Sequence, residues 1–393
     1  MAVVRPQNAH QARLLRRLRD EGPRSRAELG DAVALSRSKL AVEIDRLVRG
    51  GLLDTDGYAD SRGGRRSSIV RIARRIRFVG IDIGATSVDV ALTDGELRVL
   101  AHRAAAVDVR DGPDSVIARA LAMVAELRAE DDAPVAGAGV GVPGPVSFAD
   151  GVPVSPPIMP GWNRFPVRET FFAALGCPVL VDNDVNIMAL GEKHAGVARS
   201  VDDYLFVKIG TGIGCGIVVR GEVYRGVNGC AGDIGHMSVD EQGPVCACGN
   251  VGCLEAYFGG AALRGQALTA ARTGQSAVLA RRLAEAGDLT AVDVADAAGV
   301  GDGVAVAMIR AGGRRLGHAL AGLVSFVNPG LVVIGGGVAG IGHTLLAEIR
   351  GAVYRTSLPL ATGNLPITLS ELGDRAGVVG AARLISDHVY RAD

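Results

Sequence analysis

The chain has 393 residues and no net charge, with 42 basic and 42 acidic side chains, so it is long enough for two or three domains. Its longest uncharged run, residues 318–347, is interrupted by Asn328-Pro329-Gly330 and Gly335-Gly336-Gly337, which excludes a membrane-spanning helix there. Because several arginines lie near the N-terminus, we expect no secretory signal and a cytoplasmic protein without membrane contact. In that compartment Cys177, Cys215 and Cys230 are expected to be buried small side chains rather than disulfide partners.

The zero net charge hides an asymmetry along the chain. Residues 1–78 carry 18 Lys and Arg against 9 Asp and Glu, and the remaining residues carry the opposite excess. A basic head on an acidic body suggests that the head meets a polyanion, although basic terminal segments are often merely solvated.

The basic head is predicted to hold three helices. The first covers residues 8–20, and Ser25 caps the second, with Glu28 three residues later in a capping-box pattern. Ser36 opens the third. A tight turn at Ala34-Leu35 joins the last two into a helix-turn-helix, whose second helix would lie in the major groove of DNA.

A basic hairpin is predicted to follow these helices. Leu52-Leu53 and residues 69–72 form its strands, with a turn at Asp54-Thr55-Asp56-Gly57 and a flexible arginine-rich tip at residues 61–66. This hairpin fits a wing, because arginines on a glycine-rich loop suit phosphate or minor-groove contact. The alternative, a three-helix bundle used for oligomerisation, has no need of those arginines. The residues predicted to contact DNA are Arg37, Ser38, Lys39, Arg46, Arg62, Arg65 and Arg66.

Beyond residue 78, three glycine-rich turns each follow an apolar strand. They are Asp82-Ile83-Gly84-Ala85-Thr86-Ser87, Gly210-Thr211-Gly212 and Gly335-Gly336-Gly337. Turns of this kind hold phosphate with backbone N–H groups, while an aspartate approaches a hydrated Mg²⁺. The third turn does not fit the dinucleotide fingerprint Gly-x-Gly-x-x-Gly, so we set a Rossmann dehydrogenase aside.

Between the first two turns, Val181-Asp182-Asn183-Asp184-Val185-Asn186 places polar side chains at a strand end. Asp184 can take a proton from a hydroxyl group, and Asn183 can bind one. The alternative is an Asx turn that caps a helix over residues 187–194.

A run of cysteines predicts a metal site in the second half of the chain. Cys246, Cys248 and Cys253 fall within eight residues, and His236 lies ten residues upstream of the first. Three thiolates and one imidazole are a ligand set of closed, tetrahedral zinc sites, and the alternative is three loop cysteines that are close by chance. With four protein ligands the metal has no open position for water. We therefore expect a structural zinc that also fixes the carboxylates beside its ligands.

Together these motifs resemble the repressor/ORF/kinase (ROK) family over residues 78–393, and the head resembles the family's transcription-factor branch. The matching motifs are Asp82-x-Gly84-x-Thr86, Gly141-Val-Pro143-Gly144, Asn183-Asp184-x-Asn186, Gly210-Thr211-Gly212, Gly235-His236, Cys246-x-Cys248-Gly249-x-x-Gly252-Cys253-x-Glu255 and Gly335-Gly336-Gly337. The resemblance implies an α/β fold, with a winged helix-turn-helix (1–75) and a two-lobed, actin-like ATPase domain. Residues 76–181 with a C-terminal helix (375–393) form the first lobe, and residues 182–374 form the second.

The resemblance also implies roles for individual residues. Sugar binding is assigned to Gly144, Asn163, Asn183, Asp184, Asp233, His236 and Glu255, and ATP binding to Asp82, Gly84, Thr86, Gly210, Thr211, Gly212, Gly335 and Gly336. The zinc ligands are His236, Cys246, Cys248 and Cys253, and Asp184 matches the kinase base.

Two departures from the family pattern concern ligand binding. Asp233 stands where the family usually has Glu, and Gly84-Ala85-Thr86-Ser87 stands where the kinases favour Gly-Gly-Thr-Lys. Ala85 adds a Cβ where the backbone should approach phosphate, and the missing lysine removes a positive group.

These features predict a sugar-responsive transcriptional regulator, in the first place a repressor, that binds operator DNA as a homodimer or homotetramer and holds a structural zinc. The alternative is a glucokinase-like sugar kinase that uses ATP and Mg²⁺ with Asp184 as base, or a protein with both activities. The head favours the regulator, because a kinase needs no winged helix.

Overall fold

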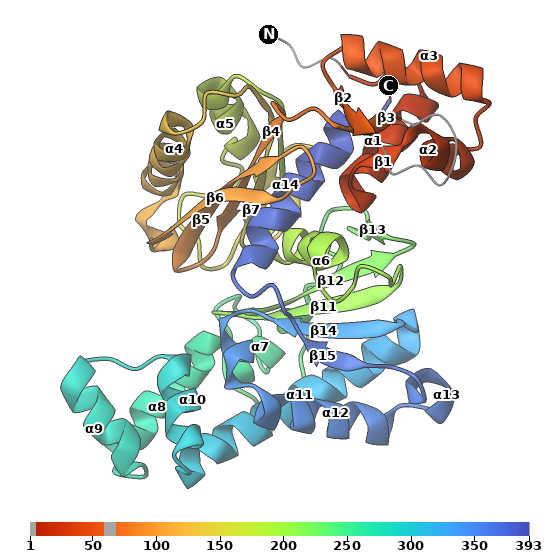
Figure 1. The fold of residues 1–393 in the computed structure, drawn as a ribbon. Coiled ribbons are helices and arrows are strands. Elements are labelled where there is room, and N and C mark those ends of the chain that lie inside the picture. The colour runs from red at the N-terminus through yellow and green to blue at the C-terminus, as the bar shows by residue number, and fades with distance from the viewer. Residues whose placement is uncertain (1–4, 59–67, 393) are drawn as a thin grey trace.

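A computed structural model describes residues 5–58 and 68–392 of the chain (Figure 1). The N-terminal head consists of α1 (Ala9–Glu21), α2 (Arg26–Val33) and α3 (Arg37–Arg49), with a sheet in the order β1 (Arg24–Ser25), β3 (Ser68–Ile72), β2 (Leu53–Tyr58). The predicted caps are confirmed. Ser25 and Glu28 form a capping box at α2, and the Ser36 side chain accepts the backbone N–H of Lys39 at α3.

One prediction for the head is wrong. The segment Asp54–Gly57 is not a turn, because β2 continues through it and pairs Asp54 with Arg71 and Asp56 with Ile69. Strand pairing with β3 overrides the turn preference of aspartate and glycine. The pairing is irregular where its register shifts between Asp56 and Tyr58. The arginine-rich tip, with Arg62, Arg65 and Arg66, lies outside the described residues.

The first sheet of the body follows the head directly. Its order is β10 (Val179–Asn183), β7 (Val135–Val142), β4 (Arg77–Ile83), β5 (Ser87–Asp94), β6 (Val99–Ala106). Apolar side chains of α4 (Pro113–Ala129) and α5 (Val167–Leu175) cover one face of this sheet. The short elements η1 (Val109–Asp111), β8 (Val146–Ser147) and β9 (Val152–Pro153) connect them.

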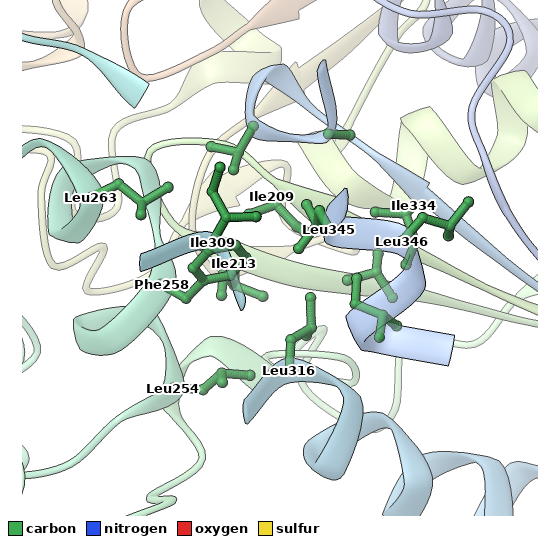
Figure 2. Packing of buried hydrophobic residues seen from close by; sticks show 14 of the residues in the cluster. Ile209, Ile213, Leu254, Phe258, Leu263, Ile309, Leu316, Ile334, Leu345 and Leu346 are labelled. Atoms are coloured by element: carbon green, nitrogen blue, oxygen red, sulfur yellow. The ribbon is translucent and has the colours of Figure 1, made fainter. Parts of the chain in front are cut away.

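The second sheet has the order β13 (Glu222–Val223), β12 (Ile213–Val219), β11 (Tyr204–Ile209), β14 (Leu331–Gly335), β15 (Ile367–Leu369). α6 (Asp184–Ala195) covers one face. The other face packs on α7 (Leu254–Phe258), α8 (Gly260–Arg272), α11 (Gly303–Val327) and α12 (His343–Thr356). Figure 2 shows strand residues such as Ile209 and Ile334 meeting Phe258 and Leu345 there. The remaining elements are η2 (Ile234–His236), α9 (Ala277–Ala286), α10 (Ala291–Gly299), η3 (Gly337–Ile341) and α13 (Pro359–Thr362).

The last helix, α14 (Arg375–Val389), joins the two halves of the body (Figure 1). It packs by its backbone, because glycines remove the side chains that would keep its neighbours away. A Cβ at Gly139 of β7 would lie 1.9 Å from the carbonyl oxygen of Ala381, and a Cβ at Gly380 would lie 1.6 Å from that of Ile187 in α6. α14 therefore lies directly against both the first sheet and α6.

Within the described part of the chain, no helix has the length and apolar character needed to cross a membrane.

We predict that Gly380→Ala lowers stability by about 3 kcal/mol or more, because the methyl group would overlap the backbone of α6. Gly322→Ala is the matched control, since Gly322 also lies inside a helix but a Cβ there would meet no atom within 4 Å. That change should be neutral or stabilising by up to about 1 kcal/mol. Thermal unfolding followed by circular dichroism measures both effects, and equal melting temperatures for the two variants would contradict the close packing of α14.

Candidate functional site

A lysine and two aspartates meet near the first and second glycine turns. Lys208, on β11, places its Nζ 2.5 Å from Oδ2 of Asp184, the first residue of α6. Burial by itself lowers the pKa of Lys208, but the charges of Asp184 and Asp82 outweigh it and raise the pKa overall. Lys208 is therefore a charged ammonium group whose direct partner is the residue predicted as the kinase base.

Asp82, on β4 of the first sheet, is the second aspartate near Lys208. Its Oδ1 atom is buried and has no hydrogen-bond partner among the described residues. The backbone of α14 lies against the other oxygen, since a Cβ at Gly377 would be 1.8 Å from Oδ2. Burial raises the pKa of Asp82 to about 7, although Lys208 acts in the opposite direction. The predicted Mg²⁺-facing aspartate is thus enclosed by protein on two sides.

The side chain of Asn183 performs the capping role that was the alternative interpretation. Its Oδ1 accepts the backbone N–H groups of Val185 (2.9 Å) and Asn186 (3.3 Å), and its Nδ2 donates to the carbonyl of Gly144 (2.9 Å). The helix that we expected from residue 187 begins at Asp184 instead, because this cap satisfies the amides of its first turn. The carboxylate of Asp182 accepts the side-chain amide of Asn186 at 2.9 Å and stabilises the same turn.

The glycine turns predicted to bind phosphate each have a packing role. The N–H of Gly84 donates to the carbonyl of Ser87 at 2.8 Å and closes the first hairpin, on which Thr86 is exposed. The carbonyls of Gly210 and Thr211 accept N–H groups at the start of α8. In the third turn, Gly336 has φ +85°, which favours glycine. Gly335 packs on β11, where its Cβ would lie 2.5 Å from the ring of Phe206, and Gly212 lies against Glu255.

The four predicted metal ligands are brought together. The ligand atoms of His236, Cys246, Cys248 and Cys253 all lie within 4.8 Å of one another. Nδ1 of His236 is 3.6 Å from the sulfur of Cys246, and the sulfurs of Cys248 and Cys253 are 3.7 Å apart. A tetrahedral zinc with Zn–S bonds of about 2.3 Å would place sulfurs about 3.8 Å apart and a sulfur and nitrogen about 3.6 Å apart. The donor set and its spacing therefore fit a closed metal site.

His236 connects this site to two carboxylates. While Nδ1 faces Cys246, Nε2 lies 4.0 Å from Oδ1 of Asp233. Oε2 of Glu255 accepts the backbone N–H of Ile213 at 3.0 Å, which holds it against the second glycine turn. Burial raises the pKa of both Asp233 and Glu255, and His236 opposes this rise. The imidazole thus turns one nitrogen toward the cysteines and the other toward Asp233.

Asn163, also predicted to bind sugar, lies on a separate, exposed loop. Its Oδ1 accepts the backbone N–H of Ser155 at 2.9 Å, and the neighbouring Pro156 packs beside Gly144, whose Cβ would lie 3.0 Å from it. Asn163 therefore supports the loop beside Gly144 in this structure.

Helix α3 exposes the residues that were predicted to contact DNA. Arg37, Ser38 and Lys39 are exposed on the first turn of α3, and Arg46 is exposed farther along it. Arg46 is 3.3 Å from Glu43, a buried carboxylate that accepts the side-chain amide of Gln11 at 2.7 Å. Sequence reasoning missed this polar contact between α1 and α3, because a glutamate among charged residues looks solvated.

Three charged residues also escaped sequence reasoning. Asp89, two residues beyond Ser87 on β5, lies 3.0 Å from Nε2 of His102, and burial raises its pKa. Lys208 stands in a strand that is otherwise apolar, and that isolation was the available signal. Arg225, 2.7 Å from Asp182, had no local signal because its partner lies 43 residues away in the sequence.

A second cluster of charges joins the head to the body. Arg19 of α1 is buried and pairs with Asp387 of α14 at 2.6 Å. Its neighbour Asp20 is 2.8 Å from Arg383 of α14 and 3.7 Å from His194 in the last turn of α6. Burial by itself raises the pKa of Asp20, but His194 and Arg19 outweigh it and lower the pKa well below its usual range. The head is thus tied to the far end of the helix that begins at Asp184.

Known proteins are similar to both the head and the body of the chain. The model of the ROK family matches residues 78–388. The putative xylose repressor of Caldicellulosiruptor sp. (strain Rt8B.4) is 32% identical over 381 residues, which cover 95% of this chain and 94% of that protein.

Two solved structures show the same division. A ROK family transcriptional regulator, a homologue of the E. coli MLC protein, superposes with a TM-score of 0.82 at 29% identity and covers 97% of this chain and 96% of its own. A ROK family glucokinase from Streptomyces griseus, in complex with glucose and AMPPNP, has a TM-score of 0.71 at 31% identity and covers 78% of this chain and 98% of its own. The regulators therefore match the head as well as the body, whereas the glucokinase matches a shorter part.

We predict that Asn183→Ala destabilises the protein by about 1–2 kcal/mol, because it removes the cap of α6 and leaves the carbonyl of Gly144 without its donor. Asn183→Ser keeps a capping oxygen and loses the donor to Gly144 without adding a charge, so its cost should be clearly smaller. Chemical unfolding monitored by fluorescence gives both values. Equal losses in the two variants would show that the cap contributes nothing.

Proposed function

This chain belongs to the ROK family, and we propose that it is a sugar-responsive transcriptional repressor, which binds operator DNA through its head and a sugar beside Asp184. The observation that carries the proposal is the polar link between the head and α6, where the carboxylate of Asp20 lies 3.7 Å from the imidazole of His194. A winged helix-turn-helix has no use in a kinase, and this one is joined to the sugar-binding half of the molecule. The repressor relative and the regulator structure both span head and body.

The link suggests how sugar can act on DNA binding. α6 carries Asp184 at its first residue and His194 in its last turn, about 15 Å apart at 1.5 Å per residue. A sugar held by Asn183, Asp184, His236 and Glu255 bears on the start of this helix. Because α14 packs directly on α6 and also pairs with α1, a shift of α6 reaches the head. Sugar then weakens DNA binding to the extent that it favours the shifted arrangement.

The charges around the first glycine turn, residues 84–87, disfavour the kinase alternative. Ala85 and Ser87 replace the glycine and lysine of the kinase pattern, and Asp89 adds a carboxylate on the same hairpin. A nucleotide triphosphate approaching this hairpin meets negative charge in place of a lysine.

We propose zinc as the metal of the site at His236, Cys246, Cys248 and Cys253. Four protein ligands would complete a tetrahedral shell, so the ion would contribute structure and no activated water. His236 would be held by it in one orientation, which places Nε2 beside Asp233 for sugar binding.

A homo-oligomer, a dimer or tetramer, is proposed as the assembly. Operator sites read by helix-turn-helix proteins are commonly paired, and two heads are needed to bind two half-sites. The exposed apolar side chains of Phe326 on α11 and of Leu358 and Leu360 near α13 offer a contact surface.

The proposal is tested with purified protein and labelled duplexes from the region upstream of its own coding sequence. D-xylose, D-glucose and N-acetylglucosamine are titrated into the complex while fluorescence anisotropy reports DNA binding. At least one sugar should weaken DNA binding about tenfold, a usual size for coupling between two sites. A coupled assay with ATP, Mg²⁺ and the same sugars should show no phosphorylation. Sugar phosphorylation without specific DNA binding would establish the kinase alternative instead.

We predict that Asp20→Asn keeps DNA binding but weakens its response to sugar, since the variant loses the charge shared by His194 and Arg383. Glu21→Gln is the control, because Glu21 pairs with Arg17 and Arg24 inside the head. The ratio of DNA affinities without and with sugar is the measurement. If Asp20→Asn responds to sugar like the wild type, this link does not transmit the signal.

We also predict about one zinc ion per chain, lost in Cys248→Ser together with a lowered melting temperature and weakened sugar binding. Cys230→Ser is the matched control, since Cys230, which was expected to be buried, is exposed and does not belong to the ligand cluster, whereas Cys177 and Cys215 are buried as expected. Metal analysis by mass spectrometry and calorimetric sugar titration provide the readouts. Zinc-free protein with normal sugar affinity would remove the metal from the function.

A further inference from the structure

Lys208 occupies a prepared position between α6 and the second sheet. Along β11 the side chains of Tyr204, Phe206 and Lys208 alternate onto the face that α6 covers, and the hydroxyl of Tyr204 donates to the carbonyl of Ala189 in α6 at 2.6 Å. The same strand register brings Lys208 to Asp184, at the start of α6.

The strand neighbours of Lys208 leave room for its long side chain. Lys208 pairs with Gly214 on β12 and with Gly335 on β14, so no side chain flanks it on either side in the sheet. A Cβ at Gly210 would lie 3.3 Å from its Cε atom, which shows that the stem runs past that turn. Gly210, Gly214 and Gly335, which belong to the glycine-rich motifs, therefore lie around the side chain of Lys208.

Asp184 has both oxygens engaged by this arrangement. Oδ1 accepts the N–H of Val185 at 2.8 Å, and Oδ2 accepts the ammonium of Lys208 at 2.5 Å. Asp82 is a second carboxylate whose charge acts on Lys208, while its Oδ1 atom has no hydrogen-bond partner among the described residues. Neighbouring carboxylates are an arrangement that attracts a divalent cation in oxygen-ligand sites. Here the ammonium group of Lys208 pairs with one of the two, Asp184.

We propose that Lys208 is the resident cation of the sugar site: it neutralises Asp184 in the presence of Asp82, so that the site binds an uncharged sugar without a divalent cation or nucleotide. The inference deepens the proposed function, since it concerns the same site. An anionic ligand is disfavoured, because Lys208 is already paired with Asp184 and the carboxylate of Asp82 also acts on it. Lys208 is therefore a specificity-determining residue, which favours sugar sensing over phosphoryl transfer.

The proposal is tested first with Mn²⁺ alone, by electron paramagnetic resonance on the zinc-containing protein. Lys208→Met removes the charge and leaves two carboxylates without their cation, so it should bind Mn²⁺ at least about tenfold more tightly than the wild type. Lys208→Arg should behave like the wild type. In Lys208→Met with Asp184→Asn the gain should disappear, because one of the two carboxylates is gone.

Lys193→Met is the matched control, since Lys193 also pairs with an aspartate, Asp202 at 2.6 Å, at the other end of α6. It should leave Mn²⁺ affinity unchanged. Lys208→Gln carries the same prediction as Lys208→Met if the methionine variant does not fold. Equal Mn²⁺ affinity in wild type and in the uncharged Lys208 variants would overturn the proposal.

The second measurement is calorimetric binding of D-xylose, D-glucose and N-acetylglucosamine with and without millimolar Mg²⁺. Wild-type affinity for the sugar that binds should be the same in both conditions, whereas Lys208→Met should bind it more weakly without Mg²⁺ and recover in part with it. Wild-type binding that requires Mg²⁺ would also overturn the proposal. The Mn²⁺ result uses neither sugar nor DNA, so a failure of sugar to release DNA would count against the proposed function and leave the Lys208 result standing.

Discussion

α14 touches the first sheet and α6 through backbone atoms, and the rest of the body depends on that close approach. Glycines at 139 and 380 make it possible, because any larger residue would place a methyl group within 2 Å of a carbonyl oxygen. Interiors packed at this density do not deform smoothly, so a helix held in this way moves as a unit with its neighbours. α14 leaves the second sheet after β15, crosses to the first, and meets the head through Asp387. The first sheet, α6 and the head are therefore in contact through one helix.

α6 is the second part of this connection, and it carries a cluster of charges at each end. Asp184 meets Lys208 at its start, and His194 meets Asp20 and Arg383 in its last turn. Partly buried ion pairs contribute little net stability, but removing one partner is costly because the other charge is left uncompensated. Such pairs can therefore favour one arrangement of the helices over another. In the proposed function, a sugar that bears on the first cluster changes the position of the second without any contact of its own with the head.

Much of the local structure could be predicted from short-range chemistry. Ser25, Glu28 and Ser36 cap their helices as expected, since a cap needs only residues within one turn. The grouping of His236 with three cysteines was also predictable, because most of the ligands share one short glycine-rich loop. The turn expected at Asp54–Gly57 was wrong because β3, a partner farther along the chain, supplied hydrogen bonds that local preference does not contain. The helix expected from residue 187 begins at Asp184, because the side chain of Asn183 caps its first turn. Cys230, expected to be buried, is exposed, because burial depends on how separate elements pack.

The sequence by itself determined which chemical groups the protein has and which short motifs they form: a basic helical head, three glycine turns, a cysteine-rich metal loop and a polar strand end. Family membership followed from those motifs. Only the tertiary structure decided which partners these groups contact. Lys208 pairs with Asp184 across 24 residues, and Arg19 reaches Asp387 across 368 residues. The register of β11 against α6 and the backbone packing of α14 bring these pairs together, and neither is encoded in any local pattern, because each depends on how separate elements meet.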